Sequence, residues 1–201
     1  MKEKIRWIIL ILAVVVFGLI VYSLNVGTIH IFDNYIYDAI SKTINPALTV
    51  IAIMITNIGG PVGITIVTII LILALPNKNH KKYILINLAS ILLLNQGLKF
   101  IFSRERPDIN RLVEVSNYSF PSGHAMTNTA FYGFLIYLIY KYVEDRKTKY
   151  ILIALISLLV IAIGLSRIYL GVHYASDVVG GAMISIAYLI VFTILVRQKL
   201  D

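Results

Sequence analysis

Five long apolar runs, separated by short polar segments, dominate the chain. They cover residues 7–24, 83–102, 124–142, 150–165 and 174–196. A helix needs about 20 residues to cross the hydrocarbon core of a bilayer, and each run is close to that length. The pattern therefore predicts an all-α, polytopic membrane protein in which these runs are transmembrane helices.

A sixth apolar run, residues 46–75, is interrupted in its middle. Asn57, Gly59, Gly60 and Pro61 lie close together there, and such residues break or sharply kink a helix. The run fits one span preceded by an interfacial helix, or two short spans.

Residues 31–40 show a different pattern, because apolar residues recur about every four positions and polar residues such as Asp33 and Asp38 lie between them. This spacing is typical of a short amphipathic helix in the membrane interface. It predicts an interfacial helix between the first and second spans. Such a helix either borders a lipid entrance or packs as a loop helix without a substrate role.

The placement of positive charge favours one span in residues 46–75, since cytoplasmic segments carry the excess of Lys and Arg. Six spans then result, with both termini in the cytoplasm and 12 of the 18 Lys and Arg on the inner side. Two spans there would place the basic N-terminus and the basic segment 141–149 on opposite sides. The inner cations are Lys2, Lys4, Arg6, Lys78, Lys81, Lys82, Lys141, Arg146, Lys147, Lys149, Arg197 and Lys199. The outer cations are Lys42, Lys99, Arg104, Arg106, Arg111 and Arg167.

The composition agrees with a membrane protein, with 59% hydrophobic and 14% charged residues and a mean hydropathy of +0.85. The net charge of +8 is mostly an orientation signal, so no nucleic-acid partner is expected. The chain has no cysteine, which excludes disulfides and thiolate metal sites. We expect one domain over residues 1–201, with the first apolar run retained as a span. The richness of the whole chain in Ile, Lys, Asn and Tyr suggests an AT-rich bacterial genome, and hence a bacterial plasma membrane.

Two cations lie where the third predicted span ends. Lys99 is followed after six residues by Arg106 and then Pro107. If the helix continues to Arg106, both cations project from one face toward an external pocket. Arg104 and Arg111, by contrast, are expected to be headgroup or loop contacts.

The fourth predicted span opens with Pro121-Ser122-Gly123-His124. A proline presets the backbone at a helix start, and the free N–H groups of a first turn can bind an anion. His124 is therefore expected at the positive end of a helix.

Arg167 ends the fifth predicted span, and His173 precedes Asp177 by four residues at the start of the sixth. On a helix this spacing brings the two side chains within hydrogen-bonding reach. A carboxylate that holds one ring nitrogen leaves the other free as a nucleophile or base. With the nearby cations, the set indicates phosphoryl transfer.

Other functions fit parts of this pattern. Two histidines and a carboxylate can bind zinc, although three nearby cations would repel a divalent ion unless phosphate intervened. The polar residues could also form a structural cluster between spans. An anion or lipid-phosphate transporter, or a binding protein without hydrolysis, would use the same cations. A transporter would be expected to show repeats and broken helices, and only the Gly59-Gly60 break suggests this.

Three segments together resemble the signatures of the type 2 phosphatidic acid phosphatase family. They are Lys99 with Arg106-Pro107, then Pro121-Ser122-Gly123-His124, then Ser166-Arg167 with His173 and Asp177. All three occur in order and with matching spacing, and the resemblance covers about residues 80–185.

The resemblance implies a lipid phosphate phosphatase that needs no metal or other cofactor. His173 would attack phosphorus, Asp177 would orient it, and His124 would protonate the leaving alkoxide and then activate water. The implied phosphate ligands are Lys99, Arg106, Ser122, Gly123 and Arg167. Substrates suggested by the resemblance are phosphatidylglycerol phosphate, phosphatidic acid and undecaprenyl diphosphate, acted on at the outer membrane face.

Overall fold

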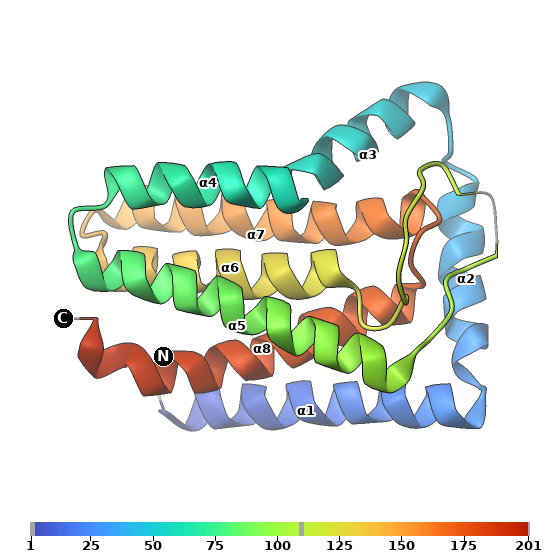
Figure 1. The fold of residues 1–201 in the computed structure, drawn as a ribbon, viewed down its shortest axis with the longest axis horizontal. Helices are drawn as coiled ribbons and strands as arrows, with labels where there is room; N and C mark the ends of the chain where they lie inside the picture. Colours follow the sequence, from blue (N-terminus) through green and yellow to red (C-terminus); the bar gives the residue numbers. More distant parts are fainter. Residues whose placement is uncertain (1–2, 109–110, 201) are drawn as a thin grey trace.

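The chain folds into a bundle of helices (Figure 1). The computed structural model describes residues 3–108 and 111–200, so Lys2, counted above among the inner cations, lies outside the described residues. The described part is all-helical, which confirms the predicted class. Its helices are α1 (Glu3–Val26), α2 (Ile29–Ser41), α3 (Pro46–Ile58), α4 (Pro61–Ala74), α5 (Lys78–Phe102), α6 (Gly123–Tyr142), α7 (Arg146–Tyr169) and α8 (Ala175–Val196), followed by a short 3-10 helix (Arg197–Lys199).

Polar side chains set where several of these helices begin. Asn45, Asn77, Ser122 and Asp145 each accept a hydrogen bond from a backbone N–H in the first turn of the helix that follows. Such caps satisfy donors that have no partner within the helix. The predicted apolar runs lie within or close to these helices, since hydropathy marks the apolar part of a helix and not its polar end.

The arrangement places α6 in the interior of the bundle, where it packs against α5, α7 and α8. Helix α2 lies across one end of the bundle, and both ends of the described chain lie at the opposite end (Figure 1). The C-terminal end of α5, the N-terminal end of α6 and the turn between α7 and α8 meet near α2. Segments far apart in the sequence therefore share one end of the molecule.

Among the described residues, four helices are long and apolar enough to cross a membrane: α1, α5, α7 and α8. Helices α3 and α4 are bent by 48° at their break and could together make a fifth span. This bend confirms the predicted interruption at Gly59 and Gly60. Helix α6 is less apolar because it buries polar residues such as Thr127 and Asn128 against its neighbours. The count of six spans stays a prediction.

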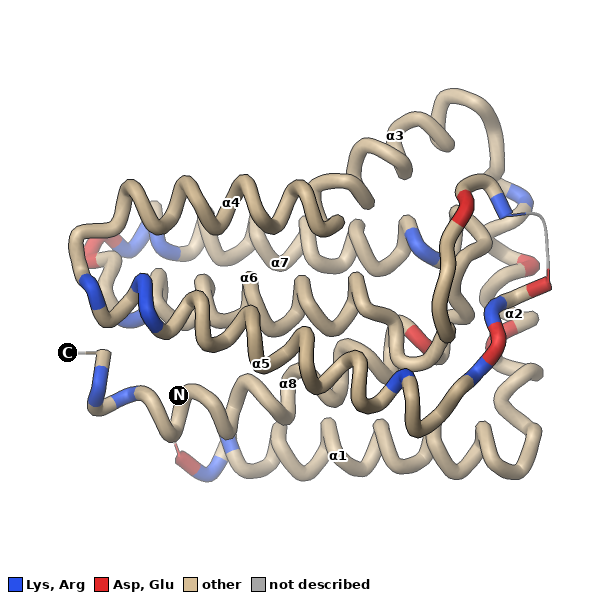
Figure 2. The backbone as a smooth tube through the Cα atoms, viewed as in Figure 1, with Lys and Arg blue, Asp and Glu red and all other residues tan. Residues whose placement is uncertain are grey.

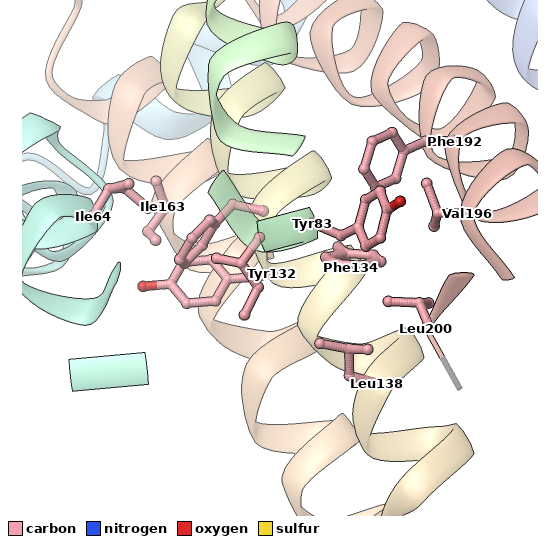
Figure 3. Packing of buried hydrophobic residues seen from close by; sticks show 11 residues of the cluster. Ile64, Tyr83, Tyr132, Phe134, Leu138, Ile163, Phe192, Val196 and Leu200 are labelled. Atoms are coloured by element: carbon pink, nitrogen blue, oxygen red, sulfur yellow. The ribbon is translucent and has the colours of Figure 1, made fainter. Parts of the chain in front are cut away.

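A cluster of apolar side chains holds the bundle together away from α2 (Figure 3). Phe134 of α6 meets Phe192 of α8 edge to face, with ring centroids 5.2 Å apart. Leu138 of α6 and Val196 of α8 belong to the same buried cluster. These contacts fix the relative position of α6 and α8, so their N-terminal ends also have a fixed relationship.

Two glycines allow α8 to approach the segment before α6. A Cβ atom on Gly180 would lie 2.7 Å from the ring of Phe120, and one on Gly181 would lie 3.1 Å from the Ser122 carbonyl oxygen. Both distances are tighter than normal van der Waals contact. The absence of a side chain at these two positions therefore brings the Pro121–His124 motif close to α8.

Candidate active site

Among the described residues, the charged ones gather at the two ends of the bundle, and the long stretch between them has none (Figure 2). The predicted site residues lie at the end covered by α2. Because apolar helix surfaces fill the middle of the bundle, polar chemistry is concentrated in this region and at the opposite end.

His173 lies in the turn before α8 and is only 3% exposed. Its Nδ1 is 3.4 Å from Oδ2 of Asp177. The expected geometry was two residues on one helix face, but α8 begins only at Ala175. Contact occurs because Asp177 folds back over the helix start, where the Tyr174 backbone N–H donates to its Oδ2 at 2.9 Å.

Ser119 also contacts this pair, although no spacing pattern in the chain predicts that it would. Its hydroxyl donates to Asp177 Oδ2 at 2.5 Å and lies 3.3 Å from His173 Nδ1. Asp177 Oδ2 is therefore surrounded by donors on the side of His173. The Nε2 atom of His173 faces away from the carboxylate and is the nitrogen left for chemistry.

Arg106 lies against that free nitrogen, with Nη1 3.2 Å from His173 Nε2. Its guanidinium group also donates to the carbonyl oxygens of Asn117 at 2.8 Å and Val172 at 2.6 Å. The helix does not continue to Arg106, which was the condition for both cations to project from one helix face, since α5 ends at Phe102 and Ser103 takes a left-handed conformation with φ of 43°. Arg106 reaches the site from an extended segment, held by backbone carbonyls.

Lys99 and Arg167 bring two more cations, and both side chains are buried. Lys99 Nζ donates to the carbonyl oxygens of Tyr118 and Ser119. Arg167 Nη1 donates to Thr56 Oγ1 at 3.0 Å, while its Nε has no acceptor within the described residues. Within the residues that the structure describes, neither Lys99 nor Arg167 forms an ion pair with a carboxylate. Buried cations without a counter-charge are costly, so the arrangement favours an anionic ligand.

The Pro121–His124 motif is fastened to its neighbours before α6 begins. The Ser122 backbone N–H donates to the Asp177 carbonyl oxygen at 3.1 Å, and Asn95 Nδ2 donates to the Pro121 carbonyl oxygen at 3.2 Å. Gly123 is the first residue of α6. The free backbone N–H groups at the start of α6 are thus held at the site, as expected for a helix start that can bind an anion.

His124 lies beside the break between α3 and α4. A Cβ atom on Gly60 would be 3.6 Å from His124 Nε2. Asn128, one turn further along α6, donates to the carbonyl oxygens of both Gly59 and His124 at 2.8 Å. Gly59 allows Asn128 to approach the break closely, since a Cβ atom there would lie 2.8 Å from Asn128 Nδ2. Asn128 thus ties the break to α6.

A cavity of about 270 Å³ opens beside His124. Polar residues of the site, among them His124 and Asn95, line one part of it, and apolar residues of α4 and α5, among them Ile64, Leu88 and Leu92, line another. Leu92 is also 47% exposed on the outer surface of the bundle. The cavity thus connects the polar site with the apolar sides of α4 and α5.

Burial lowers the pKa of His173 to about 4, and the hydrogen bond and charge of Asp177 oppose this effect. The charges of Arg106 and Arg167 lower the pKa further. His173 is consequently neutral near pH 7, which is the form that a nucleophilic imidazole requires.

Arg104 departs from its expected role. It was predicted to contact headgroups or the loop, but its Nη1 donates to Asp177 Oδ1 at 2.6 Å, so that prediction is wrong. Arg111 does make a loop contact, donating to the Pro107 carbonyl oxygen at 2.9 Å. No spacing rule separates these two arginines, because Arg104 reaches Asp177 across 73 residues of sequence.

Comparisons with known proteins identify relatives of this chain. The model of the PAP2 superfamily matches residues 80–201, more than half of the chain. Phosphatidylglycerophosphatase B of Bacillus subtilis (strain 168) is 43% identical over 93 residues, which are 44% of this chain and 44% of that protein. The bacitracin transport permease protein BcrC of Bacillus licheniformis is 39% identical over 82 residues, or 40% of this chain and 35% of that protein. These alignments span less than half the length of either relative.

Solved structures share the fold over a longer stretch. The crystal structure of a transmembrane PAP2-type phosphatidylglycerolphosphate phosphatase from Bacillus subtilis matches with a TM-score of 0.85 and 24% identity, covering 96% of this chain and 97% of that chain. The structure of Aquifex aeolicus LpxE matches with a TM-score of 0.65 and 25% identity, covering 82% and 93%. The shared fold thus includes helices that precede the residues matched by the family.

Proposed function

Because this chain belongs to the PAP2 superfamily of type 2 phosphatidic acid phosphatases, we propose that it hydrolyses a phosphomonoester or diphosphate of a membrane lipid. The observation that carries the proposal is the surroundings of His173. One ring nitrogen faces a carboxylate, the other faces Arg106, and the buried cations Lys99 and Arg167 belong to the same site. This arrangement suits an oriented nucleophile facing a bound phosphate.

In the first step, His173 Nε2 attacks phosphorus, and the bond between phosphorus and the leaving oxygen breaks. Asp177 accepts the hydrogen bond from Nδ1–H, which keeps the lone pair on Nε2 and stabilises the positive charge that develops on the ring. His124 gives a proton to the leaving oxygen. The cations and the N–H groups at the start of α6 stabilise the charge on the phosphoryl oxygens. These phosphate ligands are Lys99, Arg106, Ser122, Gly123 and Arg167.

In the second step, water attacks the phosphohistidine and the bond between phosphorus and Nε2 breaks. His124, now lacking the proton it donated, accepts one from the attacking water. Inorganic phosphate leaves, and both histidines return to their starting forms. We propose that the reaction uses no metal, since three cations of the chain supply the positive charge.

The cavity beside His124 supports a lipid as the leaving group. The proposed acid lines the same cavity as Ile64, Leu88 and Leu92. A lipid whose phosphate lay at His173 would leave its chain near these apolar residues, with the ester oxygen next to His124. Phosphatidylglycerol phosphate, phosphatidic acid and undecaprenyl diphosphate are all compatible with this arrangement, because each carries a terminal phosphate on a molecule with long apolar chains.

We also propose a single domain with six spans in a bacterial plasma membrane, both termini in the cytoplasm and the site at the outer face. The support is that basic residues such as Lys81, Lys147 and Lys199 lie at the end of the bundle opposite α2 (Figure 2). Cytoplasmic ends of spans carry such an excess. α3 and α4 would form one bent span, and α2 would lie in the outer interface.

The alternative function is an anion or lipid-phosphate transporter or binding protein without hydrolysis. This alternative is included because one relative is named as a bacitracin transport permease protein. It explains the cations. However, binding alone does not require a buried histidine whose Nδ1 faces both a carboxylate and a serine hydroxyl.

The decisive experiment measures phosphate release by the purified protein in detergent with EDTA, using a panel of lipid monophosphates and diphosphates. We expect turnover of at least one lipid and an alkali-stable, acid-labile phosphoryl group on the enzyme after rapid quenching. The His173→Ala variant should lose both signals, whereas His30→Ala, which changes an exposed histidine of α2, should retain them. Turnover that requires a metal, or none with any lipid, would contradict the proposal.

A further inference from the structure

A buried aspartate of α2 is joined to the α8 N-terminus. Asp33 is only 2% exposed. Its Oδ1 accepts the Ser176 backbone N–H at 2.8 Å, and its Oδ2 accepts the Ser176 hydroxyl at 2.8 Å. An acidic residue with so little exposure needs a counter-charge as well as hydrogen bonds.

Arg104 supplies that counter-charge and continues the link to Asp177. Its Nη2 donates to Asp33 Oδ2 at 2.7 Å, and its Nη1 donates to Asp177 Oδ1 at 2.6 Å. The guanidinium also lies over the Tyr174 ring, 3.9 Å from its centroid. The planar group is thus held by two carboxylates and an aromatic face, a geometry that lysine cannot reproduce.

The two oxygens of Asp177 consequently have separate partners. Oδ2 accepts hydrogen bonds from Ser119 and the Tyr174 backbone and faces His173, while Oδ1 is held by Arg104. If Arg104 were removed, the carboxylate could rotate about its terminal torsion, which is a soft degree of freedom. The contact between Oδ2 and His173 Nδ1 would then lose its alignment.

We propose that Arg104, anchored by Asp33, is a positioning residue that fixes the Asp177 carboxylate plane and through it the orientation of His173. The inference rests on the proposed phosphatase function and adds a role for α2. In this role α2 holds the arginine that aligns the catalytic pair, without touching substrate.

The first test compares kinetic constants of Arg104→Gln and Asp33→Asn with those of Arg111→Gln, a matched change in the same connecting segment. Outer partners of catalytic groups typically contribute about 10–100-fold to activity. We expect a loss of that size in kcat for the first two variants, with KM little changed, and no loss for Arg111→Gln. If Arg104→Gln folds poorly, Asp33→Asn tests the same link with an almost unchanged side-chain shape. Normal kcat in a folded Arg104→Gln or Asp33→Asn variant would overturn the inference.

A double-mutant cycle separates positioning from general destabilisation. If Arg104 acts through Asp177, adding Arg104→Gln to Asp177→Asn should lower kcat by less than about twofold, because the carboxylate is already lost. Full additivity of the two effects would show that Arg104 acts elsewhere.

A spectroscopic measurement tests the inference without turnover. The chain has only four histidines, so selective ¹⁵N labelling gives a simple spectrum. We expect the Nδ1–H signal of His173, assigned by its loss in His173→Ala, to shift in Arg104→Gln and to stay unchanged in Arg111→Gln. An unshifted signal would overturn the positioning role even if no lipid phosphate is hydrolysed. Conversely, a shifted signal with no hydrolysis by the wild type would count against the proposed function alone.

Discussion

At the scale of residues, the two histidines differ in what surrounds them. His173 is buried between Arg106 and Asp177, whereas His124 lines a cavity that also has apolar walls. The first environment fixes a ring and leaves one nitrogen free, and the second suits the proposed proton donor, which would lie next to the leaving group. Different consequences are therefore expected when each is changed.

The proposed proton donor can be tested through the leaving group. His124→Gln should slow hydrolysis of an alkyl lipid phosphate by about 10²–10⁴-fold, the usual contribution of a general acid or base. The phenolate of an aryl phosphate leaves without protonation. The first step with this substrate should therefore be much less affected, and phosphohistidine should accumulate. Rapid-quench measurement of bound phosphate with both substrates checks this. Equal losses in the first step for both substrates would exclude His124 as the acid.

The pKa of His173 has a consequence for the pH dependence of the reaction. In the proposed mechanism the nucleophilic form of His173 is unprotonated, so activity should be lost as the pH falls through this pKa. Since burial lowers the pKa to about 4, the acid limb of kcat/KM should lie well below the ordinary value of 6.5. Asp177 raises the pKa against burial, so the limb should lie lower still in Asp177→Asn.

The measurement is the pH profile of kcat/KM for both proteins with one substrate, whose own ionisation is common to the two. Arg111→Gln serves as the control and should keep the wild-type profile. A limb that moves to higher pH in Asp177→Asn would contradict the assignment of His173.

Most of the site could be predicted from the sequence because its residues occur in three motifs with characteristic spacing. The structure places Lys99, Arg106, His124, Arg167, His173 and Asp177 at one end of the bundle. Ser119, Arg104 and Asp33 could not be predicted, because their contacts depend on how distant segments pack. Ser119 lies in a polar segment without a periodic signal, and the amphipathic pattern of residues 31–40 places Asp33 among the polar positions although the structure buries it.

At the scale of elements, the break between α3 and α4 depends on close backbone contact. A Cβ atom on Gly63, in the first turn of α4, would lie 2.2 Å from the Ile58 carbonyl oxygen. Gly63 therefore allows the carbonyl groups at the end of α3 to turn against α4. The sequence predicts an interruption here from Gly59, Gly60 and Pro61, but it does not reveal that Gly63 is the tightest point.

The Gly63→Ala variant should accordingly be destabilised. Forcing a methyl group into such a contact typically costs about 1–3 kcal/mol, and the break carries Gly59 and Gly60 next to His124, so activity should fall as well. Thermal unfolding in detergent and phosphate release measure the two effects. Gly97→Ala is the matched control, because a Cβ atom there meets nothing within 4 Å. If both variants unfolded at the wild-type temperature, the contact at Gly63 would be unimportant.

The end of α5 shows why element boundaries are harder to predict than elements. Hydropathy places this helix correctly, and its observed end at Phe102 coincides with the end of the apolar run. The possible extension to Arg106 fails because Ser103 adopts a left-handed conformation and ends the helix. Serine is not a strong signal for that conformation, so packing must have selected it.

At the scale of the whole molecule, the proposed orientation can be measured directly because the chain contains no cysteine. Single substitutions Glu114→Cys and Lys147→Cys place exposed thiols at opposite ends of the bundle. We expect a membrane-impermeant maleimide to label Glu114→Cys in intact cells and Lys147→Cys only after the membrane is opened. The cysteine-free parent protein is the control. The reverse labelling pattern would place the site on the cytoplasmic side.

The hydrogen bonds between Asp33 and Ser176 also bear on how far the chain can be shortened from its N-terminus. The family match begins at residue 80, yet Asp33 lies well before it. Asp33 accepts two hydrogen bonds from Ser176, in the N-terminal turn of α8. A fragment restricted to the matched region would keep every motif residue but would lack Asp33, the acceptor for Arg104 Nη2 and for the Ser176 backbone N–H. We therefore expect the smallest fragment that folds independently to be larger than the signature region, and a shorter fragment to need the first helices supplied as a separate chain.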